Sequence, residues 1–288
     1  MTVSKKRREH ERFAAKVNSL NSVYNPPNPP AILYHYTDFA GLRGILASDR
    51  LWATYNRVLN DFTEQDHALR VLSAALNRFG KYTGAVAVDL LNKLPQKLRF
   101  VACFCESDDL LSMWRSYAGD GGGYCLGFDY EGLRDTGFLN MRVGSSFPLL
   151  ARVSYGDVPR DILTYLKASV AYTKATTNTL DALVETISPF FPSMIKDKAF
   201  SEEREWRKIA LDPPVEWIQF RSGHANIKPY VELACVHAFS NFKLPLVSLT
   251  YGPTLRREDH PEEILGWMLE KYGYPKVRVK PAGIPYRR

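Results

Sequence analysis

Two glutamates, Glu203 and Glu205, are the strongest candidates for acid chemistry in this 288-residue sequence. If the segment is extended, residues two apart point to the same face of a strand, so the two carboxylates lie side by side. Neighbouring carboxylates repel each other, which raises the pKa of the more buried one. A carboxylate beside a sugar can stabilise an oxocarbenium-like transition state or activate a hydroxyl group. The alternative is a charged surface strand on which Arg204 and Arg207 neutralise the acids.

A histidine and a threonine two residues apart form a second candidate site. His35 and Thr37 belong to Ile32–Thr37, a segment whose aromatic and branched residues predict a strand. Their side chains therefore share a face of the sheet and could hold the hydroxyl groups of a ribose. The alternative is a histidine with a purely structural role. A helix is expected to follow, with Phe39, Leu42, Ile45 and Leu46 at helical spacing.

Two aromatic residues share one face of a short predicted helix. Leu110, Met113, Trp114 and Tyr117 follow the helical spacing i, i+3, i+4, i+7. Trp114 and Tyr117 could stack on a planar ring such as nicotinamide or a base. Core packing is the alternative and is the favoured interpretation for Trp114, whereas the hydroxyl of Tyr117 needs a polar partner.

The elements that carry these residues are mixed in order. Because strands and helices do not alternate as β-α-β units, an α+β fold with an antiparallel or split sheet is expected. The prolines of Asn25–Pro30 mark a linker, so residues 1–30 form a basic arm and residues 31–288 one domain. The remaining strands are expected near 51–53, 100–104, 124–128, 149–155, 205–211, 216–220, 228–233, 246–251 and 276–279, and the remaining helices over 64–79, 84–97, 160–188 and 261–271.

Composition restricts the function classes. The formal net charge of +7 and the pI of about 9.1 favour a polyanionic partner such as DNA, RNA or an acidic protein. The sequence has no apolar run of about 18 residues, so a membrane span is not expected. The basic segment Lys5–Arg12 lacks a following apolar region and does not predict a secretory signal. Four cysteines in a chain of this length favour a reduced, cytoplasmic setting.

Taken together, the three motifs resemble those of ADP-ribosyltransferases. The strand His35-x-Thr37, the helix containing Gly44-Ile-Leu46 and the short strand after it resemble the opening of that fold. Glu203-x-Glu205 resembles the acidic motif of the arginine-directed transferases. The resemblance implies an ADP-ribosyltransferase-like split antiparallel sheet with flanking helices and a helical insertion, and NAD as substrate. It further implies that Glu205 is catalytic, that Glu203 orients the nucleophile, and that NAD is bound by His35, Tyr36, Thr37, Tyr117 and, less directly, Trp114.

A second resemblance covers nearly the whole chain after residue 31 and is to a large bacterial family of unknown function. Some members of that family are carried on mobile and phage-defence loci. The two resemblances together predict an NAD-dependent ADP-ribosyltransferase that acts as a toxin-like or phage-defence effector on nucleic acid or protein. The motifs that carry the family resemblance include Tyr34-His-Tyr-Thr37, Leu59-Asn-Asp61, Met113-Trp-Arg-Ser-Tyr-Ala118, Phe200-x-x-Glu-x-Glu-Trp-Arg207, Tyr251-Gly-Pro253 and Ile284-Pro-Tyr-Arg287.

Two alternative functions stay open. Cys103 and Cys105 stand on a strand where many transferases carry hydroxyl residues, and a thiol is the poorer hydrogen-bond donor. That departure leaves open a nucleotide- or nucleic-acid-binding module without catalysis. A metal-dependent nuclease is the other alternative, with Asp61, Glu64, Glu203 and Glu205 as possible Mg²⁺ ligands.

Other sites receive no support from spacing. Cys103-x-Cys105 has no second Cys/His pair at zinc-ligand spacing, and Gly119–Gly123 lacks the lysine of a P-loop. A cysteine nucleophile would need a histidine partner, which the sequence alone does not place. The pyrophosphate of NAD could be bound by Arg43, Arg115, Arg207 or Arg287, and the spacing does not select among them.

Overall fold

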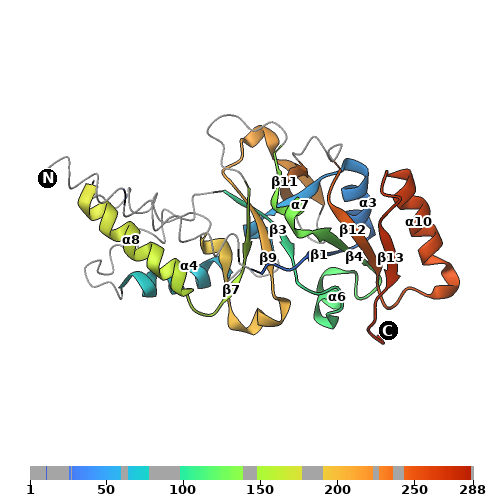
Figure 1. Cartoon of the computed structure of the whole chain (residues 1–288), viewed down its shortest axis with the longest axis horizontal. Helices are drawn as coiled ribbons and strands as arrows, with labels where there is room; N and C mark the ends of the chain where they lie inside the picture. Colours follow the sequence, from blue (N-terminus) through green and yellow to red (C-terminus); the bar gives the residue numbers. More distant parts are fainter. Residues whose placement is uncertain are drawn as a thin grey trace.

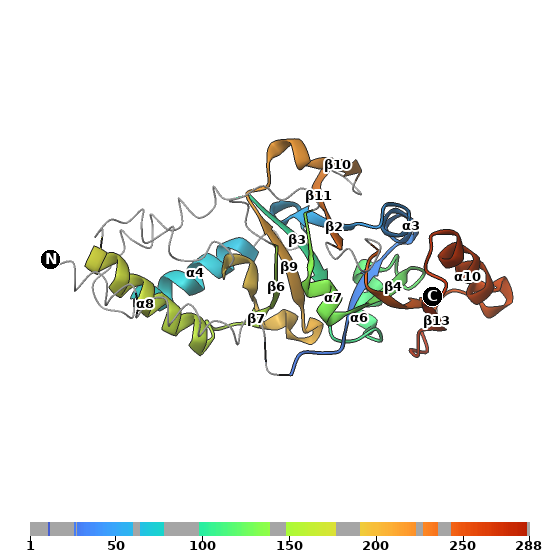
Figure 2. The same ribbon diagram turned by 45° about the horizontal axis from the view of Figure 1, so that its top comes forward.

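The computed structural model describes residues 11, 26, 28–59, 64–77, 98–138, 148–176, 191–222, 227–235 and 243–286. Within them lie two main sheets and several helices, so the expected α+β class with mainly antiparallel sheets is confirmed. Figure 1 and Figure 2 show the larger sheet at the centre, helices α4 (Glu64–Asn77) and α8 (Arg160–Thr176) on one side, and the smaller sheet and α10 (Pro261–Lys271) on the other. None of the described helices is long and apolar enough to cross a membrane.

The larger sheet is antiparallel, with the strand order β10-β11-β2-β3-β9-β6 and β5 paired to the end of β11. Strand β9, which lies between β3 and β6, is buried along its whole length. The bounds are β2 (Leu51–Tyr55), β3 (Arg99–Phe104), β5 (Thr136–Gly137), β6 (Leu149–Arg152), β9 (Trp206–Leu211), β10 (Gln219–Ser222) and β11 (Ile227–Cys235).

The smaller sheet has the order β1-β4-β12-β13, with only the last pair parallel. A two-stranded parallel ladder, β7 with β8, lies beside the larger sheet. The bounds of these strands are β1 (Ile32–Thr37), β4 (Tyr124–Asp129), β7 (Ser154–Tyr155), β8 (Ile195–Lys196), β12 (Leu246–Tyr251) and β13 (Arg278–Pro281). The short helices are α3 (Phe39–Ser48), α6 (Leu111–Tyr117), α7 (Tyr130–Arg134), η1 (Asn56–Val58), η3 (Phe191–Met194), η4 (Lys198–Glu203), η5 (Val215–Trp217) and η7 (Arg257–Asp259).

One isolated bridge joins the two main sheets. Tyr34 N donates to Cys105 O at 2.9 Å, and Cys105 N donates to Tyr34 O at 2.8 Å. Beyond this bridge β1 pairs with β4 and β3 pairs with β9, so the two strands diverge. His35 follows the bridge on one strand and Cys103 precedes it on the other, which puts both residues where the sheets separate.

The two faces of the larger sheet bury separate cores. In an antiparallel ladder, paired residues share a face and the faces alternate along the strand. Phe104 and Trp206 therefore point to the core shared with the smaller sheet. Val101 and Ile209 point to a second core, which is closed by α4, α8 and η3.

Most expected elements are present, but the acidic segment differs. Glu203 ends the 3-10 helix η4, Arg204 adopts a left-handed conformation with φ 43°, and β9 begins only at Trp206. The segment from Glu203 to Glu205 is therefore not extended, which was the condition for the two carboxylates to share one face of a strand. Residues 84–97 and 177–188, which were expected to be helical, lie outside the described residues, as does nearly all of the arm 1–30.

A buried lysine on β9 provides a test of this packing. Lys208 is fully buried, and its Nζ donates to the carbonyl oxygen of Arg134. Burial lowers the pKa of Lys208 to about 7, although Asp135 opposes the shift. An unfolded lysine has a pKa of about 10.4, so the unfolded chain binds more protons between pH 7 and 10 and stability rises with pH in that window.

We expect Lys208→Met to raise the thermal midpoint at pH 7 by about 2–4 °C, because the cost of burying an ammonium disappears. The gain shrinks at pH 10, because the folded-state lysine is neutral there and the cost of keeping it uncharged in the core has largely disappeared. Differential scanning fluorimetry at both pH values measures the effect, with the exposed Lys198→Met as control. An equal loss of stability at both pH values would contradict the assignment.

Candidate functional site

The first residue of the site, His35 on β1, is held by strand β3, at the place where the two main sheets separate. His35 Nδ1 lies 2.8 Å from Cys103 O. A carbonyl oxygen can only accept, so Nδ1 carries the proton of the bond. Burial and the charge of Arg221 lower the pKa of His35, against the opposing effect of the Cys103 carbonyl. At neutral pH the imidazole is therefore uncharged and presents Nε2 as a hydrogen-bond acceptor, which suits a ribose hydroxyl.

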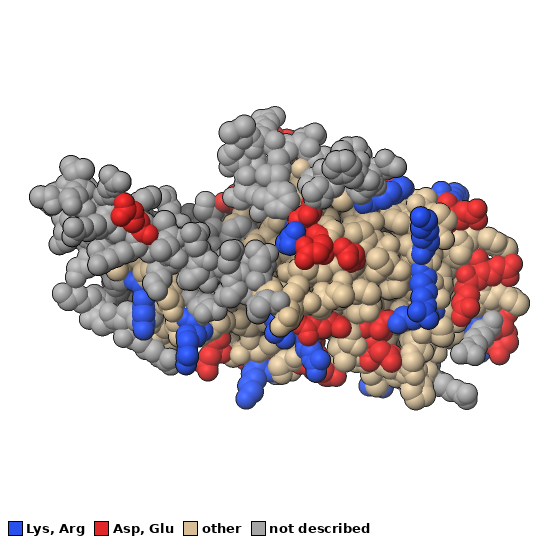
Figure 3. All heavy atoms as spheres, viewed as in Figure 1, with Lys and Arg blue, Asp and Glu red and all other residues tan. Residues whose placement is uncertain are grey.

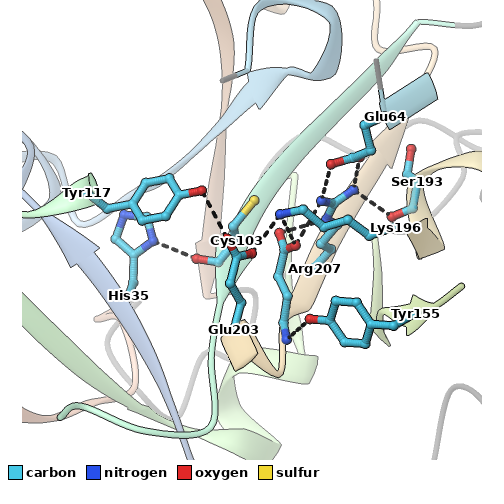
Figure 4. Close-up of polar contacts among 10 residues, drawn as sticks. His35, Glu64, Cys103, Tyr117, Tyr155, Ser193, Lys196, Glu203 and Arg207 are labelled. Atoms are coloured by element: carbon cyan, nitrogen blue, oxygen red, sulfur yellow. Dashed lines mark hydrogen bonds and ion pairs between the residues drawn. The ribbon is translucent and has the colours of Figure 1, made fainter. Parts of the chain in front are cut away.

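The second residue, Glu205, lies deep in a network of charges (Figure 4). Arg207 binds both of its carboxylate oxygens, with Nε at 2.8 Å from Oε1 and Nη2 at 2.9 Å from Oε2. Lys196 Nζ lies 3.2 Å from Oε2. Burial acts to raise the pKa of Glu205, but the charges of Arg207 and Lys196 outweigh it and lower the pKa to about 2. Glu205 is therefore an ionised side chain whose acceptor positions are already occupied by the protein.

Arg207 connects Glu205 to helix α4. Its guanidinium also binds the carboxylate of Glu64, through Nη1 to Oε1 and through Nη2 to Oε2 at 2.8 Å, and Nη1 donates to Ser193 O at 3.0 Å. Arg207 is 1% exposed. A fork of donors that meets two carboxylates and a carbonyl holds its partners in fixed positions. Arg207 is thus the rigid base of the site.

Glu203 is the outer member of the network. Lys196 Nζ donates to Glu203 Oε2 at 2.6 Å, and Tyr117 Oη donates to Glu203 Oε1 at 3.5 Å. The side chain of Glu203 is 13% exposed, compared with 5% for Glu205. Burial raises the pKa of Glu203, although Lys196 opposes the shift. Of the two glutamates, Glu203 is the one that reaches toward the exposed aromatic side chain.

Cys103 lies between the histidine and the acids. Its carbonyl binds His35, and its thiol forms a side-chain hydrogen bond with Glu205. Burial and the negative charge of Glu205 raise the pKa of the thiol well above its ordinary value. The sulfur is therefore protonated and acts as a donor to the carboxylate rather than as a nucleophile. On this strand, where the resemblance to transferases leads us to expect a hydroxyl group, the donor to the carboxylate is a thiol.

Two of the aromatic residues expected to contact NAD are core residues. Trp114 is fully buried and meets the ring of Tyr36 edge-on, with 4.9 Å between the ring centroids. Tyr36 Oη donates to Ser107 O at 3.1 Å and accepts from Leu110 N at 3.2 Å. These contacts position α6 against β1. They leave Tyr117, which is 36% exposed, as the aromatic residue of α6 that a ligand can reach.

Thr37 ends β1 at the start of helix α3. Its hydroxyl lies so close to the helix that a Cβ at Gly41 would meet Oγ1 at 1.9 Å. Its carbonyl lies as close to Gly123, where a Cβ would meet it at 2.5 Å. Thr37 therefore packs against two glycines at the entry to α3, and its contact with a ribose stays a prediction.

The acids proposed as metal ligands have protein cations as neighbours. Glu64 and Glu205 share Arg207, and Glu203 shares Lys196 with Glu205. Asp61 lies outside the described residues. Across the described part of the chain, no three His, Cys, Asp or Glu side chains form a group that could hold a metal ion.

Sequence reasoning missed Lys196 and Tyr155 and assigned Glu64 to a different role. Lys196 lies on a two-residue strand, and Tyr155 accepts a hydrogen bond from Glu205 N at 2.7 Å. Neither residue belongs to a motif with recognisable spacing. The residues around Lys196, Met-Ile-Lys-Asp, do not indicate that this lysine is buried.

Figure 3 draws the charged side chains of the described residues on one face of the molecule. Basic and acidic side chains are interspersed over that face, from α8 at one end to α10 at the other. The described part of the face carries no patch of a single sign. The site itself is acidic, because three carboxylates meet two cations in the network Glu64, Arg207, Glu205, Lys196 and Glu203.

Comparison with known proteins reaches only part of the chain. Residues 113–208 match the model of a family described as protein of unknown function (DUF2971). The matched segment runs from Met113 through Tyr117 and Lys196 to the acidic motif and Lys208. No curated protein matches the chain, and no solved structure matches it.

Proposed function

We propose that the protein is an NAD-dependent ADP-ribosyltransferase whose site lies at the split between the two main sheets. The observation that carries the proposal is the charge of the network beside His35 and Tyr117. Three carboxylates (Glu64, Glu203 and Glu205) and two cations (Arg207 and Lys196) leave a net charge of −1 in a buried environment. Such a fixed negative charge stabilises positive charge that develops on a bound sugar.

In this proposal the nicotinamide ring packs on Tyr117, and the attached ribose lies between His35 and Glu203. Neutral His35 accepts a hydrogen bond from a ribose hydroxyl through Nε2. As the bond between C1′ and the nicotinamide nitrogen lengthens, its electron pair leaves with nicotinamide and positive charge builds on the ribose. The carboxylate of Glu203 stabilises that charge, and an acceptor then attacks C1′ and loses a proton.

The structure leads us to exchange the roles first expected for the two glutamates. Glu205 is enclosed by Arg207, Lys196 and the thiol of Cys103, so a ribose hydroxyl would have to displace one of them. Glu203 is bound by Lys196 and only distantly by Tyr117. We therefore propose Glu203 as the catalytic residue and Glu205 as the residue that positions Lys196.

The alternatives are less well supported by the same contacts. Mg²⁺ would have to displace the ion pairs of Arg207 or Lys196, and those cations are themselves buried. A binding module without catalysis would use the same pocket residues but would not need an unbalanced buried carboxylate. The acceptor is proposed to be DNA, RNA or protein on the basis of the net charge of +7, and the setting to be the cytoplasm, where the four thiols stay reduced.

The test is release of nicotinamide from labelled NAD by the purified wild-type protein, with DNA, RNA and a protein lysate offered in turn as acceptors. Transfer of label identifies the acceptor, and release without transfer identifies hydrolysis. No release under any of these conditions overturns the proposal in favour of the binding module. Cleavage of DNA or RNA that requires Mg²⁺, without NAD consumption, favours the nuclease.

Tyr117 provides a matched pair of variants for the stacking step. Loss of one stacking contact costs about 1–3 kcal/mol, so we expect Tyr117→Ala to raise KM for NAD by about 10-fold or more. Tyr117→Phe keeps the ring and loses only a 3.5 Å hydrogen bond, so KM should change by less than about threefold. Steady-state kinetics with varied NAD measures both. Equal KM values for the alanine variant and wild type would remove Tyr117 from the site.

A further inference from the structure

Arg221 lies on the edge strand β10 and reaches across the sheet. Its Nη2 donates to Thr54 Oγ1 at 2.9 Å, which places the guanidinium above strand β2. On the way it passes the rings of Trp52 and Tyr230, with Cζ at 5.3 Å and 5.9 Å from the ring centroids. Aromatic faces attract a guanidinium and fix its plane. The position of this cation is therefore set by contacts with three strands, β10, β2 and β11.

Among the described residues, Arg221 forms no ion pair. Its Nε is buried and has no hydrogen-bond partner in the described part of the chain. The charge of Asp38 acts on it, but the carboxylate of Asp38 also caps helix α3 by accepting from Gly41 N at 2.8 Å. Burial lowers the pKa of Arg221, since its water shell is partly removed. A half-buried cation with these neighbours is stabilised by an anion from outside the chain.

Register places Arg221 on the same face of the larger sheet as the candidate site. Arg221 pairs with Lys228 on β11, Tyr230 pairs with Thr54 on β2, and Thr54 pairs with Val101 on β3. Because paired residues share a face and alternate residues return to it, Arg221, Thr54 and Cys103 point to one side. The charge of Arg221 also acts on the imidazole of His35, which is bound by the carbonyl of Cys103. Arg221 therefore lies within electrostatic range of a ligand whose ribose contacts His35.

We infer that Arg221 binds the diphosphate of a nucleotide whose ribose contacts His35, with Trp52, Thr54 and Tyr230 holding the guanidinium in place. The planar guanidinium, held by Thr54 and by the rings of Trp52 and Tyr230, matches the geometry of phosphate oxygens. This inference shares the ligand class of the proposed function but does not require its chemistry. Two other arginines are less suited to bind the diphosphate, because they already have protein partners. Arg207 is bound by Glu64 and Glu205, and Arg115 stacks on Tyr286 at 4.9 Å.

The test is calorimetric titration of the full chain with ADP, AMP and adenosine. We expect wild type to bind ADP most tightly and Arg221→Gln to weaken ADP binding by about 30-fold or more while leaving adenosine binding within threefold. Arg221→Lys should fall between the two, because an ammonium keeps the charge and loses the fork. Arg115→Gln is the matched control and should bind ADP as wild type does.

ADP binding to Arg221→Gln equal to that of wild type would overturn the inference, as would wild type that binds ADP no better than adenosine. If the thermal midpoint shows that Arg221→Gln does not fold, ADP and adenosine binding are compared between Arg221→Lys and wild type instead. The result is independent of turnover. If ADP binding depends on Arg221 but the protein does not consume NAD, the transferase proposal is refuted and the anion site is retained. If the protein consumes NAD and Arg221→Gln does not change the rate, the anion site is refuted and the transferase proposal is retained.

Discussion

Replacing Glu203 by glutamine is expected to lower the rate of nicotinamide release by about 10²–10⁴-fold with little loss of stability. The substitution keeps the size of the side chain and one acceptor oxygen for Lys196 but removes the charge that would face the ribose. Its cost in stability is small because Glu203 lies at the outer end of the network and is partly exposed. Single-turnover assays with labelled NAD measure the rate, and the thermal midpoint reports the fold.

Two further variants show whether the loss of rate in Glu203→Gln is specific to that carboxylate. Glu202→Gln changes a neighbouring exposed acid and should leave the rate within twofold of wild type. Glu205→Gln should lower the rate as well, but together with the thermal midpoint, because Arg207 and Lys196 lose a buried partner. A Glu203→Gln protein with wild-type rates would refute our assignment. If Glu205→Gln alone abolished the rate without a loss of stability, Glu205 would be the catalytic acid.

The pH profile distinguishes the two glutamates independently. Burial raises the pKa of Glu203, whereas Arg207 and Lys196 hold the pKa of Glu205 at about 2 against the effect of burial. If ionised Glu203 is required, the rate falls on the acid side at a pH above the ordinary range of a glutamate. If Glu205 is required, no such fall occurs above about pH 3. The residual rate of Glu203→Gln should lack the acid limb.

Much of the scaffold could be predicted from local patterns. Alternation and apolar runs predict β1, β3, β4, β9 and β12, and helical spacing predicts α3, α4 and α10. Each of these elements buries one face, so its apolar residues recur with the period of a strand or of a helix. The same reasoning separates Trp114, which is in the core, from Tyr117, whose hydroxyl needs a polar neighbour. The ADP-ribosyltransferase-like detail of the fold remains an expectation from the resemblance of the motifs.

The arrangement of the acids could not be predicted in this way. A spacing of two residues puts the carboxylates on one face only in an extended segment, but a 3-10 turn and left-handed Arg204 change the direction of the chain between Glu203 and Glu205. The partners of Glu205 come from β8 and, through Arg207, from Glu64, which is 143 residues from Arg207 in the sequence. Contacts between segments so far apart depend on the packing of α4 and η3 against the sheet and have no local signature.

Arg221 illustrates the same difficulty for binding residues. The sequence does not single out Arg221 as a phosphate-binding residue, because its polar neighbours are typical of a solvent-exposed edge strand. Its significance depends on Thr54 and Trp52, more than 160 residues earlier in the chain. Only the register of β10, β11 and β2 brings these side chains together.

Removal of Arg207 is expected to cause the largest loss of stability of any single substitution in the site. Arg207→Met leaves the carboxylates of Glu64 and Glu205 buried without their shared cation, and breaking a buried ion pair of this kind costs about 3–5 kcal/mol. Urea unfolding at pH 7 measures the loss. Arg152→Met, on the neighbouring strand β6, removes an arginine whose side chain is 58% exposed and should change stability by less than about 0.5 kcal/mol.

The dependence of this loss on pH follows from Glu205. Its pKa in the folded protein is about 2, below the value of about 4.3 for an unfolded glutamate, so it contributes stability above pH 4.3 that is lost as the pH falls toward 2. Without Arg207 the depressed pKa rises, and acid unfolding of Arg207→Met should begin at a higher pH than that of wild type. Adding Glu64→Gln to Arg207→Met removes one unpaired carboxylate, so the double variant should be less destabilised than the sum of the single variants. Simple additivity would show that Glu64 and Arg207 act independently, and the rigid base we assign to the site would then not exist.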